Sequence, residues 1–305
     1  MTHISCAVCQ SSEATTLYRP RRSPGPVVRC RRCGLVYISP VEDKHAIIET
    51  GHAGMRPELL TTDNLDDLGD CWELALLPDK EKEWPALRIN ALDALSRIER
   101  FARPPGRLLD FGCGWGFFLG VAQERGWEAY GLEPMPGQAV HARAKFGATV
   151  VADVLGDDTF PAGTFDAVTS FQVFEHLHDP ADVLKKLKPA LRPGGVILIE
   201  VPNIDTWSVK LLRSRHRHFV QDHLTFFSRA TLSRLLENHG FEVVDVYWPT
   251  RRMTLRHLVV GWGGRFAPSG IASRLRSLNS GALNKIVPLN LGDIVAVVGR
   301  KTLDR

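Results

Sequence analysis

The stretch at residues 107–120 combines an acidic side chain with three glycines spaced two residues apart. It reads RLLDFGCGWGFFLG, with Asp110 at the end of an apolar run and Gly112, Gly114 and Gly116 after it. A glycine-rich turn that follows a strand lets the backbone approach a nucleotide closely. The carboxylate two residues before the first glycine would repel a pyrophosphate, because like charges disfavour each other. The pattern therefore indicates a cationic ligand without phosphate, S-adenosylmethionine, whose ammonium group would donate to Asp110.

Two further acids follow at the expected ends of the next two strands. Glu133 in YGLEP is placed to accept both ribose hydroxyls, the role that an acid has in nucleotide folds. Asp153 in VVADVL is placed to accept from the adenine amino group. Four neighbours of the strand ends are assigned to the same cofactor site: Pro134, Val154, Phe171 and Gln172. The last two end the fourth strand, where they would border the methionyl group or the acceptor pocket, or offer backbone contacts alone.

Four cysteines near the N-terminus have the spacing of a metal site. Cys6-x2-Cys9 and Cys30-x2-Cys33 form two CxxC pairs, and Gly34 gives the second pair room to turn. Four thiolates in this arrangement suit a tetrahedral Zn²⁺ ion, and with all positions filled the site would be structural. Two disulfides, or an iron ion with the same ligands, are the alternatives. We expect the zinc ion to fold the first 40 residues, which are too few to fold alone.

Composition and charge indicate a globular chain with one basic end. The 305 residues are 44% hydrophobic and carry a net charge of +4, with no apolar run of transmembrane length. The N-terminus MTHISCAVCQ lacks the plan of a signal peptide, so a cytoplasmic protein is expected. Residues 249–290 hold seven basic side chains and no acid before Pro288. This insertion could form a lid, a homodimer face or a peripheral contact with an anionic membrane.

Strands and helices alternate through most of the chain, which predicts an α/β fold with a parallel sheet covered on both faces. After a helix over 80–101, the apolar runs predict seven strands, at 107–111, 128–134, 149–153, 165–172, 196–203, 241–248 and 293–301. Helices are predicted at 116–126, 137–147, 180–191 and 229–240. The expected units are a zinc ribbon over 1–40, an acidic helical cover over 41–79 and the sheet domain over 80–305. Ligands of such sheets bind beyond the carboxyl ends of the strands.

At this point the sequence resembles the class I S-adenosylmethionine-dependent methyltransferases, over about residues 80–300. The segments LLDFGCGWGFFL, LEP, FDAVTSFQVFEHLHDP and LRPGGVILIEVPN are similar to the motifs of that family. The segment CRRCGLVYISP is similar to a zinc-ribbon branch that includes deoxysugar C-methyltransferases and other natural-product or surface-polysaccharide methyltransferases. The resemblance implies a Rossmann-like seven-stranded sheet, preceded by the ribbon, that binds S-adenosylmethionine and releases S-adenosylhomocysteine.

Two histidine-containing segments supply candidates for a general base. A hydroxyl or carbon acceptor must lose a proton when it is methylated, so a base near neutral pKa helps. In the sugar-methylating relatives a Glu-His pair in a segment similar to Asp222-His223 supplies the base, and this resemblance makes His223 the first candidate. His176, in FEHLHDP, is the second, and Glu175 and Asp222 are expected to orient the two rings. The alternative is that these histidines are polar groups satisfied by the backbone.

The expected function is methyl transfer, by in-line displacement, to a small molecule such as a sugar or a natural-product intermediate. The basic segment RSRHRHF at 213–219 would suit a phosphorylated or nucleotide-linked acceptor, because arginine binds phosphate in a bidentate manner. An RNA methyltransferase that grips its substrate through the basic ribbon is the alternative, although EVPN replaces the Asn/Asp-Pro-Pro-aromatic motif. A third interpretation is a protein that binds the cofactor or zinc without catalysis.

Overall fold

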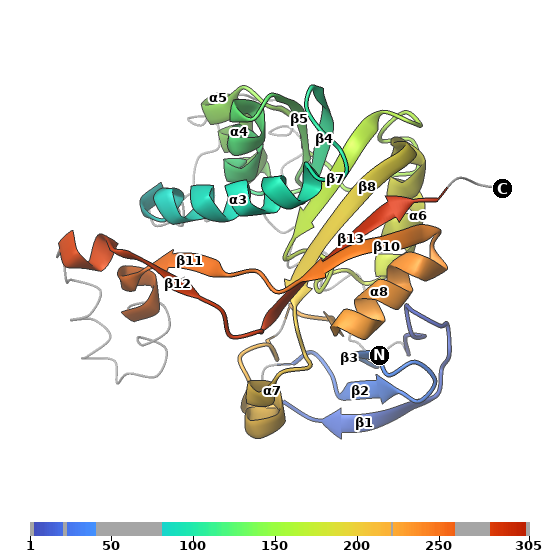
Figure 1. Cartoon of the computed structure of the whole chain (residues 1–305). Helices are drawn as coiled ribbons and strands as arrows, with labels where there is room; N and C mark the ends of the chain where they lie inside the picture. Colours follow the sequence, from blue (N-terminus) through green and yellow to red (C-terminus); the bar gives the residue numbers. More distant parts are fainter. Residues whose placement is uncertain (1–2, 21–22, 41–80, 221, 260–280, 303–305) are drawn as a thin grey trace.

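The computed structural model describes residues 3–20, 23–40, 81–220, 222–259 and 281–302 (Figure 1). The predicted acidic cover at 41–79 and the centre of the basic insertion lie outside the described residues. Among the described residues no helix is long and apolar enough to cross a membrane.

A seven-stranded sheet forms the centre of the molecule, in the order β10-β13-β8-β7-β4-β5-β6. Strands β8, β7, β4, β5 and β6 run parallel, and β13 is antiparallel to both β8 and β10. The strands are β4 (Gly106–Phe111), β5 (Trp127–Leu132), β6 (Thr149–Val151), β7 (Phe165–Phe171), β8 (Leu191–Pro202), β10 (Phe241–Tyr247) and β13 (Ile294–Lys301). The predicted fold class is confirmed.

Two strand boundaries differ from the sequence-based expectation. Strand β8 begins at Leu191, five residues before the predicted start at 196, so Leu191 and the Arg-Pro-Gly-Gly segment lie within the strand. Strand β6 ends at Val151, and Asp153 therefore follows two residues beyond the strand instead of closing it.

Helices cover both faces of the sheet. Helices α3 (Trp84–Ile98), α4 (Phe117–Glu124) and α5 (Pro136–Phe146) lie on one face, and α6 (Pro180–Ala190) and α8 (Arg229–Asn238) lie on the other (Figure 1). Strand β8 contributes to both cores, because alternate side chains of a strand point to opposite faces. Val196 and Leu198 pack toward α3, α4 and α5, whereas Ile197 and Ile199 pack toward α6 and α8.

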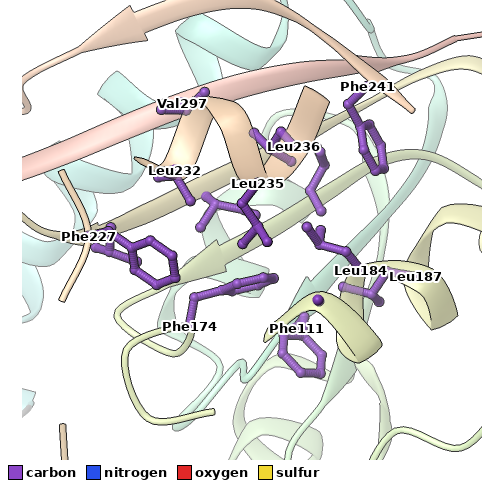
Figure 2. Packing of buried hydrophobic residues seen from close by; sticks show 14 of the residues in the cluster. Phe111, Phe174, Leu184, Leu187, Phe227, Leu232, Leu235, Leu236, Phe241 and Val297 are labelled. Carbon is purple, nitrogen blue, oxygen red and sulfur yellow. The ribbon is translucent and has the colours of Figure 1, made fainter. Parts of the chain in front are cut away.

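The core beneath α6 and α8 is densely apolar, as Figure 2 shows for leucines of both helices around Phe174, Phe227 and Phe241. The helices begin at capping residues: Asp179 accepts from two backbone amides of α6, and Ser228 forms a capping box with Thr231 at the start of α8. The same core anchors the loop after β7, because Phe174 of that loop is buried in it at 0% exposure.

The N-terminal cysteine segment belongs to a second, four-stranded sheet in the order β1-β2-β3-β9. The first three strands are β1 (Ala14–Tyr18), β2 (Val27–Cys30) and β3 (Val36–Ile38), and the fourth, β9 (Thr225–Phe226), comes from the chain after β8. Helix α7 (Trp207–Leu212) and a 3-10 turn (Arg213–Arg215) lie between β8 and β9.

The ends of the basic insertion form an antiparallel pair of strands, β11 (Arg251–Thr254) and β12 (Ile286–Leu289), after a 3-10 turn at Gly281–Asn284. The pair extends along α3 (Figure 1). Asn90 of α3 bonds both the carbonyl and the amide of Arg252, at 2.9 and 2.8 Å. The base of the insertion is thus attached to the helix that covers the strand ends.

Candidate active site

A cavity of about 550 Å³ lies between α3, the carboxyl ends of β4, β7 and β8, and the segment from Tyr247 to Arg252. The walls include the acid and the first glycine of the glycine-rich turn, together with charged side chains of β8 and β11. Its walls are formed by Leu87, Asn90, Ala91, Asp93, Ala94, Ser96, Arg97, Asp110, Gly112, Cys113, Trp115, Phe117, Phe118, Phe171, Gln172, Glu200, Tyr247, Trp248, Pro249, Thr250, Arg251 and Arg252.

The glycine-rich turn connects β4 to α4, and two of its glycines are required by close packing. Gly112 has φ +77°, and a Cβ atom there would lie 2.4 Å from a methyl carbon of Val173. Gly116, at the start of α4, has the same φ, and its Cβ would lie 2.5 Å from that of Ala142 on α5. The turn therefore lies tightly between the loop after β7 and α5, with Gly112 facing the cavity.

Asp110 is the second-last residue of β4, and its carboxylate is almost completely buried, at 2% exposure. Its Oδ1 accepts from the hydroxyl of Thr169 at 2.7 Å. Burial raises the pKa of this carboxyl, the Thr169 hydrogen bond lowers it and the carboxylate of Glu133 raises it, so that the pKa is about 7. A buried acid of this kind, at the wall of a cavity, favours a cationic ligand that would stabilise its ionised form.

Glu133 follows β5 and is 6% exposed. Its two carboxylate oxygens accept from the backbone amides of Gly114 and Met135, both at 2.9 Å, so the side chain ties the glycine-rich turn to the segment around Pro134. Each carboxylate oxygen has a second lone pair, so the group can also accept ligand hydroxyls.

Asp153 and Val154 lie after β6, the next strand of the sheet, and both are exposed. The Asp153 carboxylate accepts from the amide of Val154 at 2.7 Å. The structure thus brings Asp110, the glycine-rich turn and Glu133 together. Of the residues predicted to bind the cofactor, the cavity walls include Asp110, Gly112, Phe171 and Gln172, and they do not include Gly114, Gly116, Glu133, Pro134, Asp153 or Val154.

The cavity wall also contains a buried ion pair that could not be predicted from the spacing of motifs in the sequence. Arg251 of β11 donates through Nη2 to Oε1 of Glu200 on β8 at 2.5 Å, and Glu200 is 5% exposed. The amide of Gln172 donates to the same oxygen at 3.3 Å, and Gln172 has a φ of +57°, in the left-handed region. A signal for Glu200 was present, since it is the only acid in the apolar run VILIEVP.

The two candidate histidines lie beside each other, with ring centroids 4.8 Å apart. Nδ1 of His176 is 2.9 Å from the carbonyl oxygen of Asp222. A carbonyl only accepts, so this contact places the proton of the neutral ring on Nδ1 and leaves Nε2 with a free lone pair. The Asp222 carboxylate is 70% exposed, so it is the backbone of this residue, more than its side chain, that orients His176. Neither histidine lines the cavity.

Burial changes the ionisation of the groups around these rings. Burial and, to a smaller extent, the neighbouring His176 lower the pKa of His223 to about 4, so His223 is neutral at pH 7. Burial also raises the pKa of Glu175 to about 8, with a contribution from the carboxylate of Glu200. Glu175 is 2% exposed, and Glu175, His176 and His223 each offer a ligand atom within 4.8 Å of the others.

The four N-terminal cysteines converge on one point. The Sγ atoms of Cys6 and Cys33 are 3.3 Å apart, and those of Cys9 and Cys30 are 3.5 Å apart. All four sulfur atoms lie within 4.8 Å of one another. These separations are too long for disulfides. Four thiols at one point fit the donor set of a structural tetrahedral zinc ion.

Comparisons with known proteins agree with this arrangement. A family model described as a methyltransferase domain matches residues 86–246. A Mycolicibacterium smegmatis protein named as a probable S-adenosylmethionine-dependent methyltransferase is 32% identical over 139 residues, 45% of this chain and 52% of that protein. The C-methyltransferase NovU of Streptomyces niveus is 30% identical over 167 residues, 49% of this chain and 36% of that protein. The chain thus spans about half or less of the length of these relatives.

Solved structures share the fold. A chain from the complex between the Haloferax volcanii Trm112 methyltransferase activator and its candidate methyltransferase has a TM-score of 0.54 at 16% identity, over 79% of this chain and 99% of that chain. The YcgJ protein of Bacillus subtilis has a TM-score of 0.50 at 14% identity, over 70% of this chain and 99% of that chain.

Proposed function

Since the chain belongs to the methyltransferase domain family, we propose that it transfers the methyl group of S-adenosylmethionine to a small-molecule acceptor. The observation that carries the proposal is a single cavity whose walls include both Asp110 and Gly112, near the glycine-rich turn, and Glu200 and Arg251, from β8 and β11. A cofactor site and an acceptor site in one cavity are what a displacement reaction between two bound molecules requires.

On the cofactor side, this chain's residues would bind S-adenosylmethionine through charge and through backbone contact. Asp110 would accept from the ammonium group, and the backbone at Gly112 and Gly114 would lie along the methionyl and ribose portions. Glu133 would accept from the ribose hydroxyls with its remaining lone pairs. Asp153 would accept from the adenine amino group at the exposed end of β6. When bound, the cofactor supplies an electrophilic methyl group on a sulfonium.

On the acceptor side, Glu200, Gln172 and Arg251 offer both hydrogen-bond acceptors and donors at the cavity wall. Such a mixed set suits an acceptor with several hydroxyl groups, for example a sugar, or another natural-product intermediate. The role of these residues would be to hold the acceptor atom in line with the sulfonium methyl group, which supplies much of the rate.

Neither candidate histidine lines the cavity, so the proton released from the acceptor would reach one of them through an intervening water. His223 is neutral at pH 7, and its Nδ1 is buried without a hydrogen-bond partner, so it can accept a proton. His176 is the second candidate, since its Nε2 lone pair is free of the Asp222 carbonyl. Glu175 would position both rings from the loop after β7. General-base catalysis of this kind contributes roughly 100- to 10,000-fold to the rate.

The anionic character of the acceptor remains an expectation based on the basic segment before β9. Arg213 and Arg215 are exposed there, whereas Arg217 pairs with Asp293. A phosphorylated or nucleotide-linked acceptor would use the two exposed guanidinium groups.

The test is transfer from S-adenosylmethionine carrying a labelled methyl group. The purified chain is incubated with a desalted extract supplemented with small metabolites, and nucleic acid, protein, lipid and small molecules are then separated and counted. We expect label in the small-molecule fraction. Label in RNA would overturn the proposal in favour of an RNA methyltransferase. The absence of label from every fraction, together with tight binding of S-adenosylhomocysteine, would favour a binding protein without catalysis.

A further inference from the structure

The strand that follows the candidate base is part of the sheet of the cysteine ribbon. Strand β9 pairs antiparallel with β3, with Val36 opposite Phe226 and Tyr37 opposite Thr225. The amide of Ile38 extends this pairing by donating to the carbonyl of Leu224 at 2.9 Å. Among the described residues β3 is the only strand that pairs with β9. The backbone directly after His223 is therefore held on this side by the ribbon.

On its other side the same segment holds the loop that follows β7. The amides of Leu224 and Thr225 both donate to the carbonyl of Glu175, at 2.7 and 3.0 Å. The carbonyl of Asp222 meets Nδ1 of His176. The segment 222–226 thus lies between the ribbon and the loop that contains Glu175 and His176, and it connects the two by direct hydrogen bonds.

The connection from β3 back to the cysteines is short. Only Gly34 and Leu35 separate Cys33 from β3, and the amide of Cys30 donates to the carbonyl of Leu35 at 2.8 Å. Val36, Ile38, Leu224 and Phe226 share one buried apolar cluster, so side-chain packing reinforces the backbone pairing. A ribbon of fewer than 40 residues depends on its metal for a fixed structure.

The cofactor end of the site is fixed by different contacts. Gly112 donates to the carbonyl of Leu132 at 2.8 Å, and Glu133 holds the amide of Gly114. These groups belong to the turn between β4 and α4, to the end of β5 and to the residue that follows it, and neither of the two hydrogen bonds just named involves the ribbon.

We propose that the metal bound by the four cysteines acts as a positioning device for the acceptor half of the active site, holding His223 and the Glu175 loop through β3 and β9. Loss of the metal would release segment 222–226 and stop methyl transfer, while the site for S-adenosylmethionine stays intact. The inference rests on the proposed function for its catalytic consequence, but the structural coupling can be tested without turnover.

The first test removes zinc from the full chain with a chelator and follows amide hydrogen exchange by mass spectrometry. We expect the protection of peptides spanning 219–227 to fall by about tenfold or more, because β9 loses the hydrogen bonds that it shares with β3. The protection of peptides spanning 107–118 should be unchanged. Affinity for S-adenosylhomocysteine should stay within about threefold, and transfer should fall by about 100-fold. Adding Co²⁺ should restore protection together with the visible absorption of tetrahedral cobalt thiolate.

Two outcomes would overturn the inference. Protection of 219–227 that survives metal removal would show that the ribbon does not hold the segment. Loss of S-adenosylhomocysteine binding together with the protection would show that the metal supports the whole chain and not this half of the site. If the zinc-loaded chain binds S-adenosylhomocysteine but methylates nothing, the proposed function fails, and the exchange experiment still decides the coupling.

A variant tests the same coupling with all four cysteines intact. Phe226→Ala removes the side chain by which β9 packs on Val36 and Ile38. We expect unchanged zinc content and S-adenosylhomocysteine affinity, a kcat lowered by about tenfold or more, and a similar KM for the acceptor. Phe160→Ala, which truncates an aromatic ring packed on Phe165, is the matched control and should leave kcat unchanged. Equal effects of the two substitutions would overturn the positioning role of β9.

Discussion

Replacing Asp110 with asparagine is expected to weaken the binding of S-adenosylhomocysteine and at the same time to stabilise the ligand-free protein. The side chain is 2% exposed, and its Oδ1 accepts from Thr169, a contact that the Oδ1 of asparagine can keep. A hydrogen bond between charged groups contributes about 1.5–3 kcal/mol, which corresponds to a loss of affinity of about 10- to 150-fold.

The pH dependence of the wild-type protein follows from the raised pKa of the same carboxyl. An aspartate in the unfolded chain titrates near pH 4, whereas burial raises the pKa of Asp110 in the folded, ligand-free protein to about 7. Between these two pH values the unfolded state binds fewer protons at this carboxyl than the folded state does. The free energy of unfolding therefore falls as the pH rises, by about 4 kcal/mol in total. Asp110→Asn removes this contribution, because asparagine does not titrate.

The ammonium group of the ligand favours the ionised carboxylate, so binding and protonation oppose each other. Wild-type affinity for S-adenosylhomocysteine should rise by up to about tenfold per pH unit from pH 5.5 to about 7 and then level off. Titration calorimetry at several pH values, in buffers of different ionisation enthalpy, would also count the proton released on binding. Urea unfolding of the ligand-free proteins measures the stability difference.

Asp166→Asn is the matched control for these measurements. Asp166 is also buried, at 9% exposure, and it accepts from the amide of Arg107 near the start of β7, at the opposite end of the strands from the cavity. Its substitution should leave the affinity and its pH dependence unchanged. If Asp110→Asn binds S-adenosylhomocysteine as tightly as the wild type, or keeps the wild-type pH dependence, the assignment of Asp110 to the ligand ammonium is wrong.

The other residues of the site give four further expectations. His223→Ala should lower kcat in steady-state kinetics by about 100-fold or more and leave the affinity for S-adenosylhomocysteine unchanged. An equal loss of kcat and of affinity would show a structural role for His223. Because burial holds the pKa of His223 at about 4, the base keeps its free lone pair above that pH, and kcat should stay level from pH 8 to about 5 and fall below it. Glu200→Gln and Arg251→Lys should each raise the KM for the acceptor more than they change cofactor affinity, and unaltered KM values would remove both residues from the acceptor site. Burial raises the pKa of Glu175 to about 8, so the stability of the wild type should fall relative to that of Glu175→Gln as the pH rises from about 4.5 to 8. Urea unfolding at several pH values measures this difference, and parallel plots of stability against pH for the two proteins would contradict the expectation.

The sheet, and the grouping of Asp110 with the glycine-rich turn, could be predicted from the sequence because both depend on short continuous segments. Apolar runs marked the strands, and one continuous stretch contains Asp110 and the glycine-rich turn. The prediction was less accurate at the ends of strands, where the chain leaves the sheet. Asp153 was expected to close its strand, but β6 ends two residues earlier, and the side chain caps its own neighbour instead.

The acceptor half was harder to predict because its residues meet only through tertiary structure. Arg251 and Glu200 are far apart in the sequence, and their pairing depends on how the insertion attaches to α3. The lone acid of an apolar strand was the one local signal. The pairing of β9 with β3 had no local signal at all, since a two-residue strand has no hydrophobic periodicity.

The pairing of β3 with β9 also has a consequence for biosynthesis of the chain. The first 40 residues leave the ribosome early, but the partner of Val36 is Phe226, about 190 residues later. At a synthesis rate of about 5–20 residues per second, the nascent ribbon therefore waits roughly 10–40 seconds with an unpaired strand edge. An early-bound metal ion would keep this edge in a defined shape during that interval, and cells short of zinc should accumulate aggregated chains before they accumulate inactive ones.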